Sequence, residues 1–316
     1  MSLNPSLDTI ASLLEGGVEI LSCSAPLAPL EIRPRYECEI LLSHILGVER
    51  IYLHTHSPEA VTSESSQRFL ELLALRAEGR PLEYLTGRVS FYGREFGICE
   101  GVLVPRPETE LLVERASELI TRFGLTHIAE VGVGSGIVSI SLALLHQGVH
   151  FIATDINPTA INLTRQNIAL HAPSAQIELF HCSMLECLNA PSALSSVSQS
   201  LAPQAPASQP PTSQSFMRPL ATPQLIVSNP PYIARDYPIS TPLTYEPREA
   251  LFSGDDGLCA LRELITLAQG LKAWLVCEIG YDQREGLTQI LNSHGAHEVA
   301  FYKDYSGFDR GFIARF

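Results

Sequence analysis

A rigid polar turn that directly follows an apolar run is the most distinctive feature of this sequence. The run "QLIVS" (224–228) predicts a buried strand, and the tetrapeptide Asn-Pro-Pro-Tyr follows it at 229–232. Two consecutive prolines end a strand abruptly, because neither has an N–H group for the ladder and each fixes its own φ. The sequence therefore predicts a preorganised turn that presents one amide, Asn229, and one aromatic ring, Tyr232.

This turn matches the Asn/Asp-Pro-Pro-aromatic motif of methyltransferases that act on planar nitrogens. An amide or exocyclic amine is a poor nucleophile because its lone pair is delocalised. The side-chain oxygen of Asn229 and the carbonyl of Pro230 can each accept one N–H of the target NH2 group, which directs the lone pair at the methyl carbon. Pro231 helps to keep these acceptors in place, and Tyr232 offers a ring on which a planar group can stack. An ordinary turn with a core-facing tyrosine is the alternative interpretation.

A second signal is the glycine-rich stretch "AEVGVGSGIVSI" (129–140), where a predicted strand gives way to a predicted helix. Three glycines alternate there, at Gly132, Gly134 and Gly136. Glycine permits a tight turn and close approach of the backbone to a ligand, and the first turn of a helix offers unpaired N–H groups. This pattern indicates a binding loop for an anionic or nucleoside ligand.

A carboxylate, Asp155, ends the next predicted strand, "HFIATD". At that position it is placed to accept hydrogen bonds from a ribose diol. Its alternative role is a helix N-cap, but Asn157, directly before Pro158, suits that role better. Asp155 and the glycine turn together favour a nucleoside cofactor.

The glycine spacing distinguishes between nucleoside cofactors. The dinucleotide fingerprint is G-x-G-x-x-G, whereas Ile137 stands here at the place of its third glycine. The turn resembles instead the first motif, E/D-x-G-x-G-x-G, of Rossmann-like class I S-adenosylmethionine-dependent methyltransferases. That resemblance implies S-adenosyl-L-methionine as cofactor and S-adenosyl-L-homocysteine as product, and it leaves an NAD(P)-dependent oxidoreductase as a distant alternative. The residues that wrap the cofactor would be Gly132, Val133, Gly134, Ser135 and Gly136.

Four further segments extend the resemblance over most of the chain. They are "GRPLEYLTGRVSFYGREFGICEGVLVPRPETELLVERA" (79–116), "YEPREALFSGDDGL" (245–258), "EIGYDQ" (278–283) and "KDYSGFDRGFIARF" (303–316). In combination they resemble the release factor glutamine methyltransferases, the HemK/PrmC family. The resemblance implies methylation of the N5 side-chain amide of the glutamine in the Gly-Gly-Gln motif of peptide chain release factors. Its alternative is an N6-adenine nucleic-acid methyltransferase, which needs a basic groove and a base-reading domain.

The resemblance also implies roles for individual residues. Asp155 would bind the ribose, and the turn of Asn229, Pro230, Pro231 and Tyr232 would hold the glutamine. The family often carries Asp and then an aromatic residue near the adenine, where this sequence has Ser183 and Met184, and we take Met184 as a cofactor contact. The signature loop, Arg106, Pro107, Glu108 and Thr109, should border the cofactor, although Glu108 and Thr109 fit a helix cap and first turn equally well.

The elements that position these residues follow from periodicity. Residues 1–86 show helical spacing of apolar side chains, and we predict a helical N-terminal domain that helps to recognise the substrate. Residues 87–104 predict a β-hairpin linker. From 105 to 316 short apolar strands alternate with helical stretches, which predicts an α/β catalytic domain with a parallel sheet. Within it, 189–223 is rich in Ser, Pro, Ala and Gln and predicts a disordered insertion.

Composition narrows the function classes. The formal net charge is -13 and the lysines are only Lys272 and Lys303, so we expect no direct nucleic-acid binding. The seven cysteines include no CxxC pair, and the chain has neither a signal-peptide pattern nor a long apolar run, which favours a cytoplasmic protein without membrane contact. His44, His54, His56 and His181 have no metal-ligand spacing with a cysteine or carboxylate, so we expect no metal. We expect a monomer whose partner is a release factor.

Overall fold

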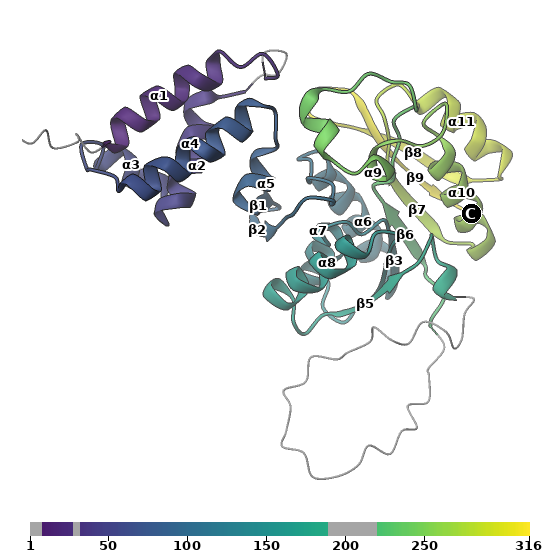
Figure 1. Ribbon diagram of the computed structural model, residues 1–316. Helices are drawn as coiled ribbons and strands as arrows, with labels where there is room; N and C mark the ends of the chain where they lie inside the picture. Colours follow the sequence, from purple (N-terminus) through teal and green to yellow (C-terminus); the bar gives the residue numbers. More distant parts are fainter. Residues whose placement is uncertain (1–7, 28–31, 189–219) are drawn as a thin grey trace, which may run out of the picture. The chain divides into compact units, whose positions relative to one another are not determined.

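The computed structural model describes residues 8–27, 32–188 and 220–316 of the chain (Figure 1). Most of the predicted insertion, up to residue 219, therefore lies outside the described residues. The chain folds into two compact units. Among the described residues the first comprises 8–27, 32–88, Ile98–Glu100 and Pro238–Glu246, and the second comprises Val89–Gly97, 101–188, 220–237 and Pro247–Phe316.

The first unit is helical. Its helices begin at recognisable signals: the Thr9 side chain accepts a hydrogen bond from Ser12 N, and Thr62 caps a later helix in the same way. A buried ion pair joins two helices, with 2.7 Å between Arg76 Nε and Glu37 Oε2. The helices are α1 Ile10–Ser22, α2 Pro34–Leu46, α3 Arg50–Thr55, α4 Ser63–Ala77 and α5 Leu82–Thr86, and the short helix η2 Thr241–Tyr245 belongs to the same unit.

The second unit is built on a seven-stranded sheet with the order β5-β4-β3-β6-β7-β9-β8. Neighbours among the first five strands of this order are parallel, whereas β9 runs antiparallel to both β7 and β8. The predicted parallel sheet is thereby confirmed. The strands are β3 His127–Val131, β4 His150–Asp155, β5 Gln176–His181, β6 Leu225–Ser228, β7 Trp274–Glu278, β8 His297–Lys303 and β9 Asp309–Arg315.

Helices cover both faces of this sheet. Ile152 on β4 joins an apolar cluster that includes side chains of α10 and α11, whereas the next residue, Ala153, packs with Ile161 of α8. Successive strand residues point to opposite faces, so the two clusters lie on opposite sides of the sheet. Double coverage explains why β6 and β7 are buried along their whole length. The helices are α6 Thr109–Phe123, α7 Ile137–Leu145, α8 Pro158–His171, η1 Glu186–Leu188, α9 Arg248–Leu251, α10 Cys259–Leu271 and α11 Arg284–Ser293. Within the described ranges, no helix has the length and apolar character that a membrane span requires.

A hairpin of β1 Arg88–Phe91 and β2 Arg94–Gly97 precedes the sheet in the chain. Its two turn residues, Tyr92 and Gly93, have φ values of 50 and 71, the conformation that a two-residue hairpin turn requires. Asn167 of α8 accepts a hydrogen bond from Gly97 N at 2.9 Å and donates one to Gly97 O at 3.0 Å. The segment predicted as a linker thus has its residues 89–97 attached to the second unit.

Candidate active site

The carboxyl ends of β3, β4, β5, β6 and β7 meet at one edge of the sheet, because these strands are parallel. A cavity of about 290 Å³ opens at this edge. Both chemical motifs border it, since the glycine turn follows β3 and the Asn-Pro-Pro-Tyr turn follows β6. The predicted site residues in its lining are Gly132, Val133, Gly134, Ser135, Asp155, Met184, Asn229, Pro230 and Pro231.

Two predicted site residues, Gly136 and Tyr232, are not among the described residues that line the cavity. Gly136 has a φ of +84, and a Cβ atom there would meet Thr164 Cγ2 of α8 at 2.8 Å. This glycine therefore permits close packing of α7 on α8. At Gly132 and Gly134 a Cβ atom would meet nothing within 4 Å, so the positive φ of each residue is what favours glycine there.

Asp155 lies at the end of β4 and its carboxylate braces the glycine turn. Its Oδ2 accepts a hydrogen bond from Gly134 N, and its Oδ1 accepts one from Asn157 N, each at 2.9 Å. Burial raises the pKa of Asp155, and these two N–H groups oppose that rise. A carboxylate oxygen has two lone pairs, so each oxygen retains an acceptor site for a ligand in the cavity.

Glu130, which was not among the predicted site residues, also lines the cavity. Its side chain is buried, and Oε2 accepts hydrogen bonds from the Ser139 backbone N–H and hydroxyl. Burial raises the pKa of Glu130 to about 8. The sequence signal that could have identified Glu130 is its position as the acidic residue that begins the E/D-x-G-x-G-x-G motif. A cationic group of a ligand in the cavity would favour the ionised form of this carboxyl and lower its pKa again.

The chain after the Asn-Pro-Pro-Tyr turn is held by two of the segments that carry the family resemblance. Within 245–258, Leu251 O accepts from Ile233 N and Ser253 N donates to Ile233 O, both at 2.9 Å. Within 278–283, Gln283 Nε2 donates to Tyr232 O at 2.8 Å. These segments, distant in sequence, hold the exit of the turn in place.

Hydrogen bonds also fix the side chains of the turn. Asn229 Nδ2 donates to Thr109 Oγ1 at 3.2 Å, and the Thr109 hydroxyl donates to Glu278 Oε2 at 2.8 Å. Tyr232 OH donates to the other oxygen of this carboxylate, Glu278 Oε1, at 3.1 Å. Thr109 therefore contacts the turn directly, whereas Arg106, Pro107 and Glu108 are not among the described residues in the cavity lining.

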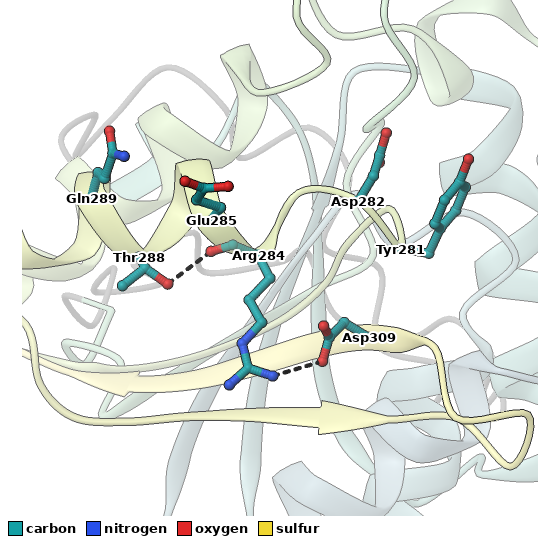
Figure 2. A pocket seen from close by; sticks show the side chains of 7 residues that line it. All are labelled: Tyr281, Asp282, Arg284, Glu285, Thr288, Gln289 and Asp309. Carbon is teal, nitrogen blue, oxygen red and sulfur yellow. Dashed lines mark hydrogen bonds and ion pairs between the residues drawn. The ribbon is translucent and has the colours of Figure 1, made fainter.

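A second, more open depression of about 510 Å³ lies on the surface beside α11 (Figure 2). The Arg284 guanidinium in it pairs with Asp309 at 3.1 Å, and the Thr288 hydroxyl donates to the Arg284 carbonyl at 2.8 Å. None of the predicted site residues is among the described residues that form it, and we do not assign it a catalytic role. Its lining is Tyr281, Asp282, Arg284, Glu285, Thr288, Gln289 and Asp309.

The chain is similar in sequence to known proteins over most of its length. Residues 29–87 match the PrmC N-terminal domain model, and residues 107–193 match the ribosomal protein L11 methyltransferase (PrmA) model. The release factor glutamine methyltransferase of Bacillus cereus is 34% identical over 285 residues, covering 86% of this chain and 89% of that protein. The enzyme of the same name from Burkholderia pseudomallei is 32% identical over 313 residues, covering 97% and 95%. The chain belongs to the release factor glutamine methyltransferase family.

A solved structure supports the fold class of this family member. The catalytic domain of hMettl16, in complex with a MAT2A 3'UTR hairpin, aligns with a TM-score of 0.50 and 15% identity, covering 80% of this chain and 82% of that one. At this identity the likeness shows the fold alone. Together with the strand order, it confirms the predicted Rossmann-like class I methyltransferase sheet.

Gly257 provides a test of how strongly the family segments hold the turn. Its φ is +75, and a Cβ atom would clash with Tyr232 O and lie 2.9 Å from Gln283 Nε2. We expect Gly257→Ala to lower the free energy of unfolding by about 1–3 kcal/mol, because the added methyl group must displace the turn. Turnover should fall with it. Thermal melting and a methyl-transfer assay measure the two effects.

The matched control is Gly270→Ala in α10, where a Cβ atom would meet nothing within 4 Å. Alanine at a helical position without a clash should leave stability unchanged or raise it slightly. If Gly257→Ala melted and turned over like the control, the close packing of Gly257 against Tyr232 would be contradicted.

Proposed function

We propose that this protein transfers a methyl group from S-adenosyl-L-methionine to the N5 side-chain amide of the glutamine in the Gly-Gly-Gln motif of peptide chain release factors. The observation that carries the proposal is one cavity whose wall includes both the glycine turn with Asp155 and the acceptors of Asn229 and Pro230. A nucleoside cofactor and a planar amide can thus occupy adjacent parts of one site. The names of the relatives supply the substrate class.

The residues present fit the cofactor. Asp155 retains acceptor sites for the ribose hydroxyls, and the buried Glu130 carboxyl suits an ammonium group. Ile156 and Met184 supply apolar surface for the adenine, and Thr154 Oγ1 holds the Met184 carbonyl in place at 2.6 Å. When bound, S-adenosyl-L-methionine supplies a methyl group that its sulfonium already activates.

The residues of the turn supply hydrogen-bond acceptors that make the substrate amide nitrogen a better nucleophile. Asn229 Oδ1 and the Pro230 carbonyl would each accept one N–H of the glutamine NH2 group, which draws the nitrogen toward pyramidal geometry. The prolines hold both acceptors before the substrate binds, so little reorganisation accompanies the reaction. The surplus proton of the methylated amide leaves to water, and the site residues need not act as a strong base.

The alternatives differ in what they require. An N6-adenine nucleic-acid methyltransferase would use the same turn, but the net charge of -13 is unfavourable for a polyanionic substrate. An NAD(P)-dependent oxidoreductase would have no use for the Asn-Pro-Pro-Tyr turn, and Ile137 replaces its third glycine. The proposal therefore names a release factor as the protein partner of a cytoplasmic monomer, without direct contact to nucleic acid.

Mass spectrometry tests the proposal directly. The purified protein is incubated with S-adenosyl-L-methionine and an unmethylated peptide chain release factor, and the peptide that contains the Gly-Gly-Gln motif is analysed. The expected result is a mass increase of one methyl group on the glutamine. A release factor with that glutamine replaced by alanine is the negative control, and an adenine-containing oligonucleotide is the competing substrate. Methylation of the oligonucleotide instead of the release factor would overturn the assignment.

A further inference from the structure

A buried carboxylate lies directly behind the substrate-facing turn. Glu278 ends β7, is 1% exposed, and accepts hydrogen bonds from Thr109 and Tyr232 through its two oxygens. Neither Glu278 nor Thr109 supplies the acceptors that the proposed mechanism uses. We propose that Glu278, acting through Thr109, is a positioning residue that determines which end of the Asn229 carboxamide faces the substrate. This inference rests on the proposed function.

The argument is one of hydrogen-bond polarity. A threonine hydroxyl has a single proton, and Thr109 donates it to Glu278 Oε2 at 2.8 Å. The same hydroxyl can therefore only accept a hydrogen bond from Asn229. The Asn229 amide must direct Nδ2 at Thr109 Oγ1, and these two atoms are 3.2 Å apart. The oxygen of a carboxamide points away from its nitrogen, which leaves Asn229 Oδ1 for the substrate side. An amide in the opposite orientation would present N–H groups to an NH2 group and would bind it poorly.

The ionised state of Glu278 is what sets this polarity. A carboxylate can only accept, whereas a protonated carboxyl can donate. If Glu278 donated to Thr109 Oγ1, then Thr109 could donate to Asn229 Oδ1, and the amide would turn its nitrogen toward the substrate. The other oxygen of Glu278 holds Tyr232 at 3.1 Å, so one carboxylate orients both ends of the Asn229–Tyr232 turn.

The surroundings of Glu278 place this change in an accessible pH range. Burial raises the pKa of Glu278 to about 7. The hydrogen bonds from Thr109 and Tyr232 and the positive charge of Arg310 lower this pKa, whereas the negative charge of Glu108 raises it by a smaller amount. Tyr302 of β8 also faces this carboxyl, and Arg310 is itself paired with Asp304 at 2.9 Å. The ionised fraction of Glu278 increases with pH through this range, so the productive amide orientation should increase with it.

Substitution of Thr109 tests the relay. Thr109→Val keeps the shape of the side chain but removes the hydroxyl, and we expect kcat with a release factor to fall about 10–100-fold, since a small misplacement of an acceptor has effects of that order. Calorimetric affinity for S-adenosyl-L-homocysteine and the melting temperature check the cofactor site and the fold. Thr109→Ser keeps the hydroxyl and should recover most of the lost turnover. Thr266→Val in α10, an exposed site, is the matched control.

A pH profile separates positioning from a merely structural role. In the wild-type protein kcat should rise with pH through a midpoint near the Glu278 pKa of about 7. Glu278→Gln keeps an oxygen acceptor for Thr109 and has no proton to lose, so this rise should be absent. The NMR shift of the Asn229 side-chain amide, identified by its loss in Asn229→Ala, should titrate in the wild type and stay constant in Glu278→Gln.

The outcomes distinguish the proposed function from the positioning role of Glu278 and Thr109. A wild-type protein that leaves the release factor unmethylated overturns the proposed function, and the NMR titration then still decides the orientation of Asn229. A wild type that methylates the release factor together with a Thr109→Val variant of unchanged kcat overturns the relay. An Asn229 amide shift that does not titrate in the wild type, or that titrates equally in Glu278→Gln, overturns the role of Glu278.

Discussion

Asn229→Ala is expected to lower kcat for methyl transfer about 10²–10³-fold, the usual effect of losing one preorganised hydrogen bond to a reacting group. Asn229 supplies one of the two acceptors that would hold the glutamine amide, and alanine leaves one N–H of the substrate without a partner. Among the described residues its side chain donates a hydrogen bond to Thr109 alone, so the fold should persist. Single-turnover kinetics with a release factor measure the effect.

Two further measurements make this result specific. Affinity for S-adenosyl-L-homocysteine should stay near the wild-type value, because the proposed cofactor contacts lie on the glycine turn and Asp155. Asn292→Ala, at an exposed position of α11, is the control for asparagine removal. Near wild-type kcat in Asn229→Ala under saturating substrate would exclude Asn229 as the amide acceptor.

Asp155→Ala should weaken S-adenosyl-L-methionine and S-adenosyl-L-homocysteine alike, by about 100-fold. The two ligands share the ribose, and hydrogen bonds to a charged group contribute about 1.5–3 kcal/mol each. The variant also removes the acceptor of Gly134 N and Asn157 N, which loosens the glycine turn. Isothermal calorimetry with each ligand gives the two dissociation constants.

Asp155→Asn refines this experiment because it keeps one side-chain oxygen as an acceptor, so its loss of affinity should be smaller. Glu178→Ala on β5 is the control, since Glu178 is exposed and is not among the described residues that line the cavity. Equal affinities in the wild type and Asp155→Ala would remove Asp155 from the cofactor site, and a loss for only one of the two ligands would contradict a ribose contact.

Local rules made much of the site predictable from sequence. Two prolines after an apolar run specify a strand that ends in a rigid turn, and alternating glycines specify positive φ after β3, as the structure shows for Gly132 and Gly134. Parallel strands then bring their carboxyl ends to one edge of the sheet. These rules need no knowledge of side-chain packing, so the sequence alone predicts that Asp155 and Asn229 lie at the ends of parallel strands at one edge of the sheet, and the structure shows both in the lining of one cavity.

The tertiary structure alone decided which side chains support that site. Thr109 and Glu278 are separated by 169 positions in sequence, and their hydrogen bond depends on how α6 lies against β7. Gly136 packs against Thr164 through a contact between helices, and residues 89–97 join the second unit through Asn167 of α8. No periodicity or turn rule encodes such contacts, because each arises from the packing of elements far apart in the chain. The sequence by itself determined the Asn-Pro-Pro-Tyr turn and the glycine turn, and only the packing of helices on the sheet decided how the Asn229 amide is oriented.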